Sequence, residues 1–424
     1  MLKKPLFIFF SIILITGCVS KNSFRPQADF VCELSPSEQC IKQARLSVPT
    51  AKGNSYLLSF FEFDDQGFLH NKENKSTIIH EYKNIAATED VILIVFVHGW
   101  HHTADSDPED SNITSFREIL ANASDYLDKK VLGVYVGWRG DSVRVPLLDS
   151  YNIVNWSTFW ERKNTAHEIG TQGLTDLMLE LEEVVQPRSS SNHKMLSIGH
   201  SFGGAALFSS IKPVLAERLI QSREKNSGVE GFGDLVLLMN PAFEGTKYAS
   251  LFELSQNDCK PYISTQKPRF ISLSSSADLA VKWLFPTGRR LSTIAESYRD
   301  VSLTHCKDGE SIPTPLLDTE DTDRYGMGHN SFLISHTLTL SNDPETKVTS
   351  PTVNPLLQKE EWDSSLESGT AYFANFELKH NKITDAHSPY MNIHTDSSIM
   401  DGHNDIWNDN VKMFIYQILN LANN

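Results

Sequence analysis

The sequence predicts an α/β protein with a doubly wound, mostly parallel sheet. Its clearest signal is the unbroken apolar run Val91–Val97, in which most residues are β-branched. Such a run is typical of a strand that is buried on both faces. Shorter runs of the same kind follow along the chain, and stretches with helical spacing lie between them. Strands that alternate with helices indicate parallel pairing through right-handed crossovers.

The remaining elements follow from the same two patterns. The other expected strands cover residues 56–64, 132–136, 195–198, 235–239, 270–273, 372–378 and 390–395. The expected helices cover residues 112–128, 163–185, 205–219 and 404–421. The Asp-Gln-Gly sequence at 65–67 indicates a turn, and we expect a short return strand after it.

Two segments lack this alternation. Residues 18–54 are polar and mixed in composition, and we interpret them as a tether. Residues 285–370 are irregular and rich in proline, serine and threonine, which indicates an insertion before the last strands. The sequence therefore predicts one large domain over residues 55–424 that contains this insertion.

Composition excludes some classes of function. The chain has 424 residues, of which 40% are hydrophobic and 21% charged, as in globular proteins. Its formal net charge of −15 argues against a nucleic-acid partner, because phosphate binding requires clustered lysine and arginine. The cysteines lack the CxxC spacing of zinc sites, and no P-loop is present.

The first 17 residues are expected to be an export signal. Two lysines precede an apolar run over 6–15, which is too short to span a membrane, and the run ends in Thr-Gly-Cys18. This ending resembles the lipobox of bacterial lipoproteins, and the resemblance implies lipidation of Cys18 and attachment to a membrane. Because Val19 is not aspartate, the outer membrane of a Gram-negative cell is the expected location. The alternative is an ordinary secretory signal with an incidental cysteine.

Four further cysteines make an even set, which fits disulfide bonding in an oxidising compartment. Three connectivities are possible. Proximity along the chain favours pairing Cys32 with Cys40 and Cys259 with Cys306.

The sequence GHSFG at 199–203 carries the strongest chemical signal. It follows an expected strand and precedes an expected helix, which is the context of a G-x-S-x-G nucleophile elbow. In that turn the serine, here Ser201, is exposed, and glycines stand where side chains would collide. The chain here resembles the α/β-hydrolase superfamily, in particular serine esterases and lipases. The resemblance covers about 88–284 and 371–424 and rests on four motifs in the expected order.

The first of the other motifs is Val-His-Gly-Trp at 97–100, at the end of the most apolar strand. The resemblance implies an oxyanion hole made by the backbone N–H groups of Trp100 and Phe202. We expect His98 to orient this loop rather than to act in catalysis.

The acid is expected after a strand beyond the nucleophile helix. Asp278 follows the strand at 270–273 and resembles the orienting acid of the family. The alternative is Glu244, which follows the preceding strand.

The base is expected on the last loop before the final helix. His403 precedes the final helix and follows the strand at 390–395, which is where the family places its base. His329 stands in the same Gly-His-Asn context, but it falls inside the insertion, away from any predicted sheet edge. His394 and His387 are further candidates.

Several aromatic side chains have two readings. Trp138 and Arg139 end a strand and could line a substrate site, although a packing aromatic and a structural ion pair are favoured. Trp156, Phe159 and Trp160 could form an acyl-binding wall, whereas a buried helix face is the default reading.

The expected function is hydrolysis of a small-molecule or lipid carboxylic ester, through an acyl-enzyme on Ser201. This mechanism requires no metal and no organic cofactor, and we expect neither. A peptidase, amidase or acyltransferase could use the same residues. A non-catalytic surface lipoprotein built on a hydrolase scaffold is the remaining alternative.

Overall fold

A computed structural model gives the structure of the chain. It describes residues 17–18, 21–35, 40–106, 109–140, 143–144, 153–186, 192–225, 228–307, 309–312, 317–341 and 369–423. The segment 1–16 of the expected export signal, and the side chain of Trp156, lie outside the described residues.

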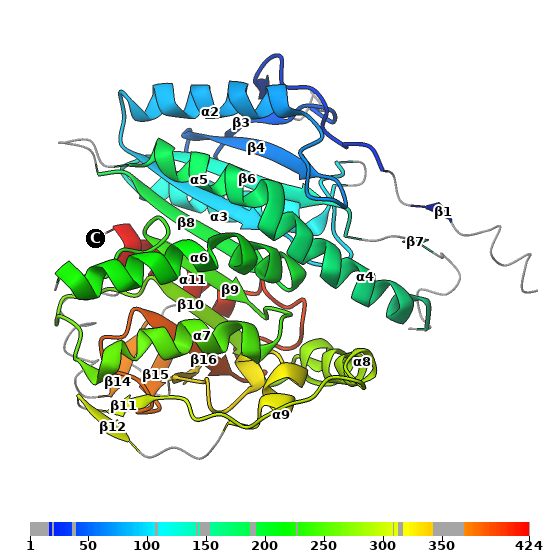
Figure 1. Ribbon diagram of the computed structural model, residues 1–424. Helices are drawn as coiled ribbons and strands as arrows, with labels where there is room; N and C mark the ends of the chain where they lie inside the picture. The colour runs from blue at the N-terminus through cyan, green and yellow to red at the C-terminus, as the bar shows by residue number, and fades with distance from the viewer. Residues whose placement is uncertain are drawn as a thin grey trace, which may run out of the picture.

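The secondary structure alternates between strands and helices along most of the chain (Figure 1). The strands are β1 (Gly17–Cys18), β2 (Cys32–Glu33), β3 (Arg45–Pro49), β4 (Ser55–Phe63), β5 (Val91–Val97), β6 (Lys130–Trp138), β7 (Val143–Arg144), β8 (Lys194–His200), β9 (Leu235–Met239), β10 (Phe270–Ser275), β11 (His305–Lys307), β12 (Glu310–Ile312), β13 (His336–Leu340), β14 (Thr370–Phe373), β15 (Phe376–His380) and β16 (Tyr390–Thr395). The helices are α2 (Lys72–Ala86), α3 (Ser111–Tyr126), α4 (Ile153–Ile169), η1 (Gly170–Leu174), α5 (Thr175–Val184), α6 (Phe202–Lys225), α7 (Gly245–Ser255), η2 (Asn257–Cys259), η3 (Ala280–Leu284), α8 (Phe285–Ser292), α9 (Thr319–Arg324), η4 (Met327–His329) and α11 (Asp409–Asn423).

The described strands form one large sheet and two small ones. The large sheet has 12 strands in the order β14-β15-β13-β16-β10-β9-β8-β5-β6-β4-β3-β2. Every neighbouring pair from β13 through β16, β10, β9, β8, β5 and β6 to β4 is parallel. The antiparallel pairs are β3–β4, β13–β15 and β14–β15. The protein therefore has an α/β fold with a large, mostly parallel sheet.

Helices cover both faces of this sheet (Figure 1). The apolar side chains of α3 and α11 pack on one face, and those of α2, α4, α5, α6 and α7 pack on the other. β5 lies at the centre, and its side chains alternate between the two layers: Phe96 points into one, and Val95 and Val97 point into the other. Successive side chains of a strand point to opposite faces, so a strand covered on both sides is apolar at every position.

α3 lies close to its expected range, α6 extends beyond its range at both ends, α4 begins earlier than expected at Ile153, and α11 begins later than expected at Asp409. The stretch 163–185 is not one straight helix, because η1 interrupts it between α4 and α5. Helix α2 was not expected, because only Ile78, Ile79, Tyr82 and Ala86 of its residues are buried. A helix that buries so narrow a face leaves a weak periodic signal in the sequence.

The segment at 18–54, expected to be a tether, contributes β2 and β3 to the edge of the large sheet. In β3, Leu46 and Val48 are buried while their neighbours are more exposed, which is the alternation of a strand that is covered on one face. The segment that precedes β2 is attached to Glu62 near the end of β4. The Glu62 carboxylate accepts hydrogen bonds from the Ser23 hydroxyl and the Arg25 backbone N–H.

The predicted strand at 372–378 is wrong, because residues 370–380 form a hairpin of β14 and β15 that turns at Ala374. Ala374 has a φ of 48°, a left-handed conformation that ends the first strand. The expected return strand after Gly67 is reduced to a single bridge between Phe63 and Leu69.

The insertion is also less separate than expected. It supplies β13, which pairs in parallel with β16 inside the large sheet. The insertion therefore extends the sheet rather than only decorating it.

Both cysteine pairings favoured by proximity are present as disulfides. The Cα atoms are 5.9 Å apart for Cys32–Cys40 and 5.2 Å apart for Cys259–Cys306. The second disulfide joins the end of η2 to β11 in the insertion. Within the described ranges, every helix is too short or too polar to qualify as a membrane span.

Candidate active site

Three of the predicted site residues meet at the carboxyl edge of the parallel sheet. Ser201 follows β8, Asp278 follows β10, and His403 lies on the loop after β16. The Ser201 Oγ is 2.7 Å from His403 Nε2, and His403 Nδ1 is 2.7 Å from Asp278 Oδ2. The carboxyl edge of an open parallel sheet is where ligands bind in such folds. Residues separated by more than 200 positions in the chain thus form one continuous hydrogen-bonded group.

The backbone of Ser201 is held in a sharp turn between β8 and α6. Its φ is 55°, which a residue other than glycine adopts only at a cost of roughly 1–2 kcal/mol. A Cβ atom on Gly203 would collide with the carbonyl oxygen of Val97, and one on Gly199 would lie 2.8 Å from the Cα of Gly204. Gly203 is therefore required for the close packing of this turn against the end of β5, and Gly199 for the close approach of α6 to β8.

The charges of the site are fixed by burial and hydrogen bonding. Asp278 is fully buried, and burial alone would raise the pKa of its carboxyl. The charge and hydrogen bond of His403, with the backbone N–H of Val281, outweigh burial and lower that pKa. The ionised carboxylate of Asp278 accepts a hydrogen bond from the N–H at Nδ1 of His403. The unprotonated Nε2 of His403 can then accept a hydrogen bond from the Ser201 hydroxyl.

The loop that carries His403 is fastened to the sheet by two side chains. His200 donates a hydrogen bond from Nε2 to the His403 carbonyl oxygen at 2.9 Å. The Asn240 amide donates to the carbonyl oxygens of Gly402 and His403, both at 3.1 Å. Burial lowers the pKa of His200 well below its ordinary value, so this histidine is neutral and serves as a donor.

Neither His200 nor Asn240 was singled out from the sequence. His200 lies inside the GHSFG motif, so the sequence shows that it is next to the proposed nucleophile. The sequence does not show that its hydrogen-bond partner is the carbonyl oxygen of His403. Asn240 follows β9 and has a φ of 42°, a conformation that asparagine tolerates better than most residues. A polar residue directly after a buried strand was the only available signal for it.

The expected oxyanion donors lie beside the serine. A Cβ atom on Gly99 would lie 2.8 Å from the Ser201 Cβ, so the peptide that leads to Trp100 runs directly against Ser201. Phe202 is the first residue of α6, and its N–H belongs to the helix-terminal groups that have no intrahelical acceptor. Both backbone segments therefore border the space next to Ser201 Oγ.

His98 orients the Gly99 loop from within the core. Its Nδ1 donates to the Gly99 carbonyl oxygen at 2.8 Å, and its Nε2 accepts from the Trp138 backbone N–H at 3.0 Å. Burial lowers the pKa of His98 to about 4, so the ring is neutral at pH 7. This arrangement agrees with an orienting role and gives His98 no contact with Ser201 among the described interactions.

A cluster of aromatic rings borders the same space. Phe159 from α4 lies 5.3 Å from Trp100 and 4.8 Å from Phe202, measured between ring centroids. Trp160 contacts Phe159 and Phe285, with centroid distances of 5.3 and 5.7 Å. Phe159, Phe202 and Phe285 are buried, so the rings pack on one another, and Phe159 belongs to the buried helix face that the sequence favours.

Glu244, the alternative acid, lies elsewhere. It is buried at the start of α7, and Lys163 donates a hydrogen bond to it, with Arg289 at 3.4 Å. The nearby cations lower the pKa of Glu244 against the effect of burial. Glu244 is thus the centre of a structural ion-pair group between α4, α7 and α8.

His329 lies closer to the site than expected. The expectation that it lies away from the sheet edge is wrong, because Gly328 of the same turn η4 packs against Ser274 near the end of β10. Burial lowers the pKa of His329 to about 4, although the nearby Asp278 charge opposes this effect. The histidine that contacts Ser201 is nevertheless His403.

The other two candidate bases have no contact with Ser201 among the described interactions. His394 hydrogen bonds through Nδ1 to the Gly328 carbonyl oxygen at 3.0 Å. His387 precedes β16 and therefore lies at the opposite end of that strand from the loop carrying His403. Both histidines thus have positions unsuited to the role of base for Ser201.

Trp138 and Arg139 have structural contacts. The Trp138 ring stacks on His98 at a centroid distance of 5.6 Å, and its indole N–H donates to the His98 carbonyl oxygen. Arg139 forms an ion pair with Asp65. Their packing and pairing match the favoured reading of the sequence.

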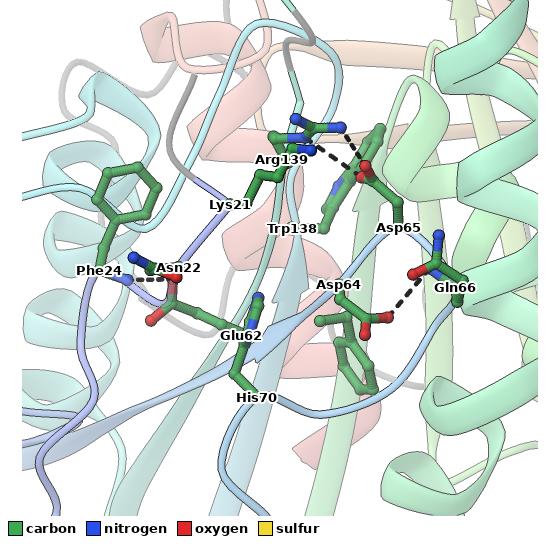
Figure 2. Close-up of a pocket in the computed structure, with 11 residues that line it drawn as sticks. Lys21, Asn22, Phe24, Glu62, Asp64, Asp65, Gln66, His70, Trp138 and Arg139 are labelled. Atoms are coloured by element: carbon green, nitrogen blue, oxygen red, sulfur yellow. Dashed lines mark hydrogen bonds and ion pairs between the residues drawn. The ribbon is translucent and has the colours of Figure 1, made fainter. Parts of the chain in front are cut away.

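A separate cavity of about 320 Å³ lies beside Arg139 (Figure 2). Its acidic side chains are already engaged, since Asp65 binds Arg139 and Arg162 while Glu62 binds the N-terminal segment. In the part of the chain that the structure describes, no three His, Cys, Asp or Glu side chains are grouped to hold a metal ion.

Comparison of the chain with models of known protein families, with characterised proteins and with solved structures found no match.

Proposed function

We propose that this protein is a serine hydrolase of the α/β-hydrolase fold that cleaves carboxylic esters through an acyl-enzyme on Ser201. The observation that carries the proposal is the hydrogen-bonded series Ser201–His403–Asp278 at the carboxyl edge of a parallel sheet. The left-handed backbone of Ser201 and the packing of its flanking glycines add support, because a nucleophile elbow requires both. Ser201 itself is only 2% exposed, less than the sequence pattern led us to expect.

In the proposed reaction, Ser201 Oγ attacks the ester carbonyl carbon as His403 Nε2 takes the hydroxyl proton. Asp278 stabilises the resulting imidazolium and keeps its orientation. The negative charge that develops on the carbonyl oxygen is accepted by the backbone N–H groups of Trp100 and Phe202, at the N-terminus of α6.

The tetrahedral intermediate then collapses. The ester C–O bond breaks, and His403 returns the proton to the departing alkoxide, which leaves as an alcohol. A water molecule next attacks the acyl-enzyme, with His403 as base, and releases the carboxylic acid and free Ser201. We propose that an apolar acyl or alcohol group contacts Trp100 and Trp160, the partly exposed rings of the aromatic cluster.

We further propose that the chain is exported and anchored through lipid on Cys18, with the outer membrane as the expected location. The two disulfides support export, because such bonds persist in oxidising compartments. Metabolic labelling with a fatty-acid analogue, in wild type and in a Cys18→Ser variant, tests the anchor. Label that persists in the variant would contradict it.

Covalent labelling by a fluorophosphonate probe tests the nucleophile. We expect labelling that maps to Ser201 and disappears in Ser201→Ala, together with hydrolysis of short-chain esters. Ser209→Ala is a matched control, because Ser209 Oγ also hydrogen bonds a histidine, His167 Nδ1, at 2.8 Å.

The control should retain labelling and turnover. Ester hydrolysis that survives in Ser201→Ala would overturn the proposal. Peptide or amide turnover far above ester turnover would replace the proposed substrate class, while leaving Ser201 as the nucleophile.

A further inference from the structure

The helical segment that follows Asp278 carries unusually exposed apolar side chains. Leu279, Trp283, Leu291 and Ile294 expose 63%, 64%, 69% and 85% of their surfaces. The spacing of Leu279, Trp283 and Leu291, by four and eight residues, places them on one side of η3 and α8, opposite the buried Val281 and Phe285. Ile294 follows directly after the C-cap of α8. Contiguous apolar surface of this kind marks an interaction site.

Basic side chains interrupt this apolar surface. Residues 279–294 contain Lys282, Arg289 and Arg290 and no acidic residue, in a chain with 53 acidic and 38 basic residues. Lys282 and Arg290 are exposed, whereas Arg289 pairs inward with Asp323. We call the exposed set the apolar–basic face: Leu279, Lys282, Trp283, Arg290, Leu291 and Ile294.

The opposite side of the same helix borders the candidate active site. Phe285 is fully buried against Trp160, and a Cβ atom on Gly288 would overlap the Trp160 indole, so α8 is seated closely on the aromatic cluster. Leu279 is also the neighbour of Asp278 in the chain. A surface held by the apolar–basic face would therefore lie close to Asp278 and to the aromatic cluster.

The N-terminal end of the described chain lies on the same side of the molecule. β1, which contains Cys18, and α8 both lie at the right-hand side of Figure 1. A membrane attached at Cys18 would thus be on the side toward which α8 is placed.

We propose that the apolar–basic face docks on an anionic lipid surface, with Trp283 and Ile294 in the interface and Lys282 and Arg290 at the phosphate groups. Tryptophan and aliphatic side chains beside lysine and arginine are the composition of interfacial helices. Charge complementarity favours this occupant, because the rest of this acidic chain would be repelled by anionic lipid. The inference deepens the proposed function, on which it rests for its catalytic meaning: esters presented at a lipid surface would be the substrates.

Vesicle flotation of the full chain carrying Cys18→Ser tests the docking without a contribution from acylation. Vesicles contain phosphatidylcholine alone, or phosphatidylcholine and phosphatidylglycerol in equal parts. We expect binding that requires phosphatidylglycerol. Trp283→Ser with Ile294→Ser should weaken it at least about tenfold, and Lys282→Glu with Arg290→Glu should abolish the preference for the anionic lipid.

A matched control replaces exposed apolar residues elsewhere. Leu179 on α5 and Ile220 on α6 are 40% and 46% exposed, and Leu179→Ser with Ile220→Ser should leave vesicle binding unchanged. Unchanged melting temperatures show that all variants are folded. Absence of vesicle binding, binding that is insensitive to the face variants, or a stable dimer that Trp283→Ser dissolves would overturn the proposal.

The readouts also separate this inference from the proposed function. Intact fluorophosphonate labelling of Ser201 without vesicle binding would overturn the docking alone. Vesicle binding with no labelling of Ser201 would overturn the hydrolase assignment alone.

Discussion

His200 and His403 are joined by a hydrogen bond from the His200 Nε2 to the His403 backbone carbonyl oxygen, at 2.9 Å. The residue directly before the proposed nucleophile thus holds the loop that carries the proposed base. Because His200 also precedes the elbow, a single side chain relates the positions of Ser201 and His403.

Replacing His200 with phenylalanine should lower kcat about 10- to 100-fold with little change in KM, because a loosened His403 is misaligned with Ser201. Glutamine keeps an N–H donor and should restore much of the activity. Steady-state kinetics on a soluble short-chain ester, with the rate of fluorophosphonate labelling, measures the effect. Equal loss in both variants would contradict a positioning role for the hydrogen bond.

Replacing Asp278 with asparagine should lower kcat about 10⁴-fold, because His403 loses the partner that fixes its tautomer. Glu244→Gln is the control: it leaves Lys163 unpaired and lowers stability, but each folded molecule should keep activity within about tenfold of wild type. Rates normalised to folded protein distinguish the two outcomes. The reverse ranking would assign the acid to Glu244.

Gly203 and Gly204 should differ sharply in tolerance to alanine. The Cβ of Gly203→Ala would overlap the carbonyl oxygens of Val97 and His98, both backbone atoms in the core, so we expect a loss of more than about 3 kcal/mol or no folded protein. For Gly204→Ala the nearest atom is the Pro241 Cβ at 3.2 Å, and the effect should stay within about 1 kcal/mol. Urea denaturation compares them, and similar losses would contradict the packing argument.

The buried His98 should make the protein less stable in acid. Burial lowers its pKa from 6.5 to about 4, so the unfolded chain takes up a proton on this residue at a higher pH than the folded protein does. The contribution of neutral His98 to the free energy of unfolding is fully present above pH 6.5. It is lost as the pH falls toward 4, and the loss amounts to at most about 3 kcal/mol. Urea denaturation across this pH range measures the slope.

The His98→Gln variant separates the pH-dependent contribution of His98 to stability from the contributions of the other buried histidines. The variant should be less stable than wild type at pH 7, and the difference should shrink as the pH falls. Stability curves that stay parallel in the two proteins would show that His98 does not titrate as the structure indicates.

The central strands could be predicted from the sequence because burial on both faces leaves an unbroken apolar run, as in Val91–Val97. The outer part of the sheet could not. β3 and β13 lie in segments that resemble loops, and β13 is placed by its pairing with β16, which is distant in sequence. The hairpin at 370–380 was hidden because the turn at Ala374 lacks glycine or proline.

Ser201, Asp278 and His403 could be selected because each follows a strand that is strongly apolar or occupies the last loop. Chain order thus carried spatial information. The residues that hold His403 in place could not be selected, because His200 and Asn240 act through backbone carbonyl groups that no sequence pattern marks. The same limit hid the position of His329, whose neighbourhood depends on where β13 joins the sheet.

Ser23, Phe24 and Arg25 are hydrogen bonded to Glu62 and so are part of the folded domain. These bonds limit the length of chain that connects Cys18 to the domain. Only the stretch from Cys18 to Ser23 is left to act as a spacer, and it can span no more than about 17 Å when fully extended. A lipid-bearing Cys18 would therefore confine the domain to a thin layer above the bilayer, where diffusion in search of substrate is reduced from three dimensions to two.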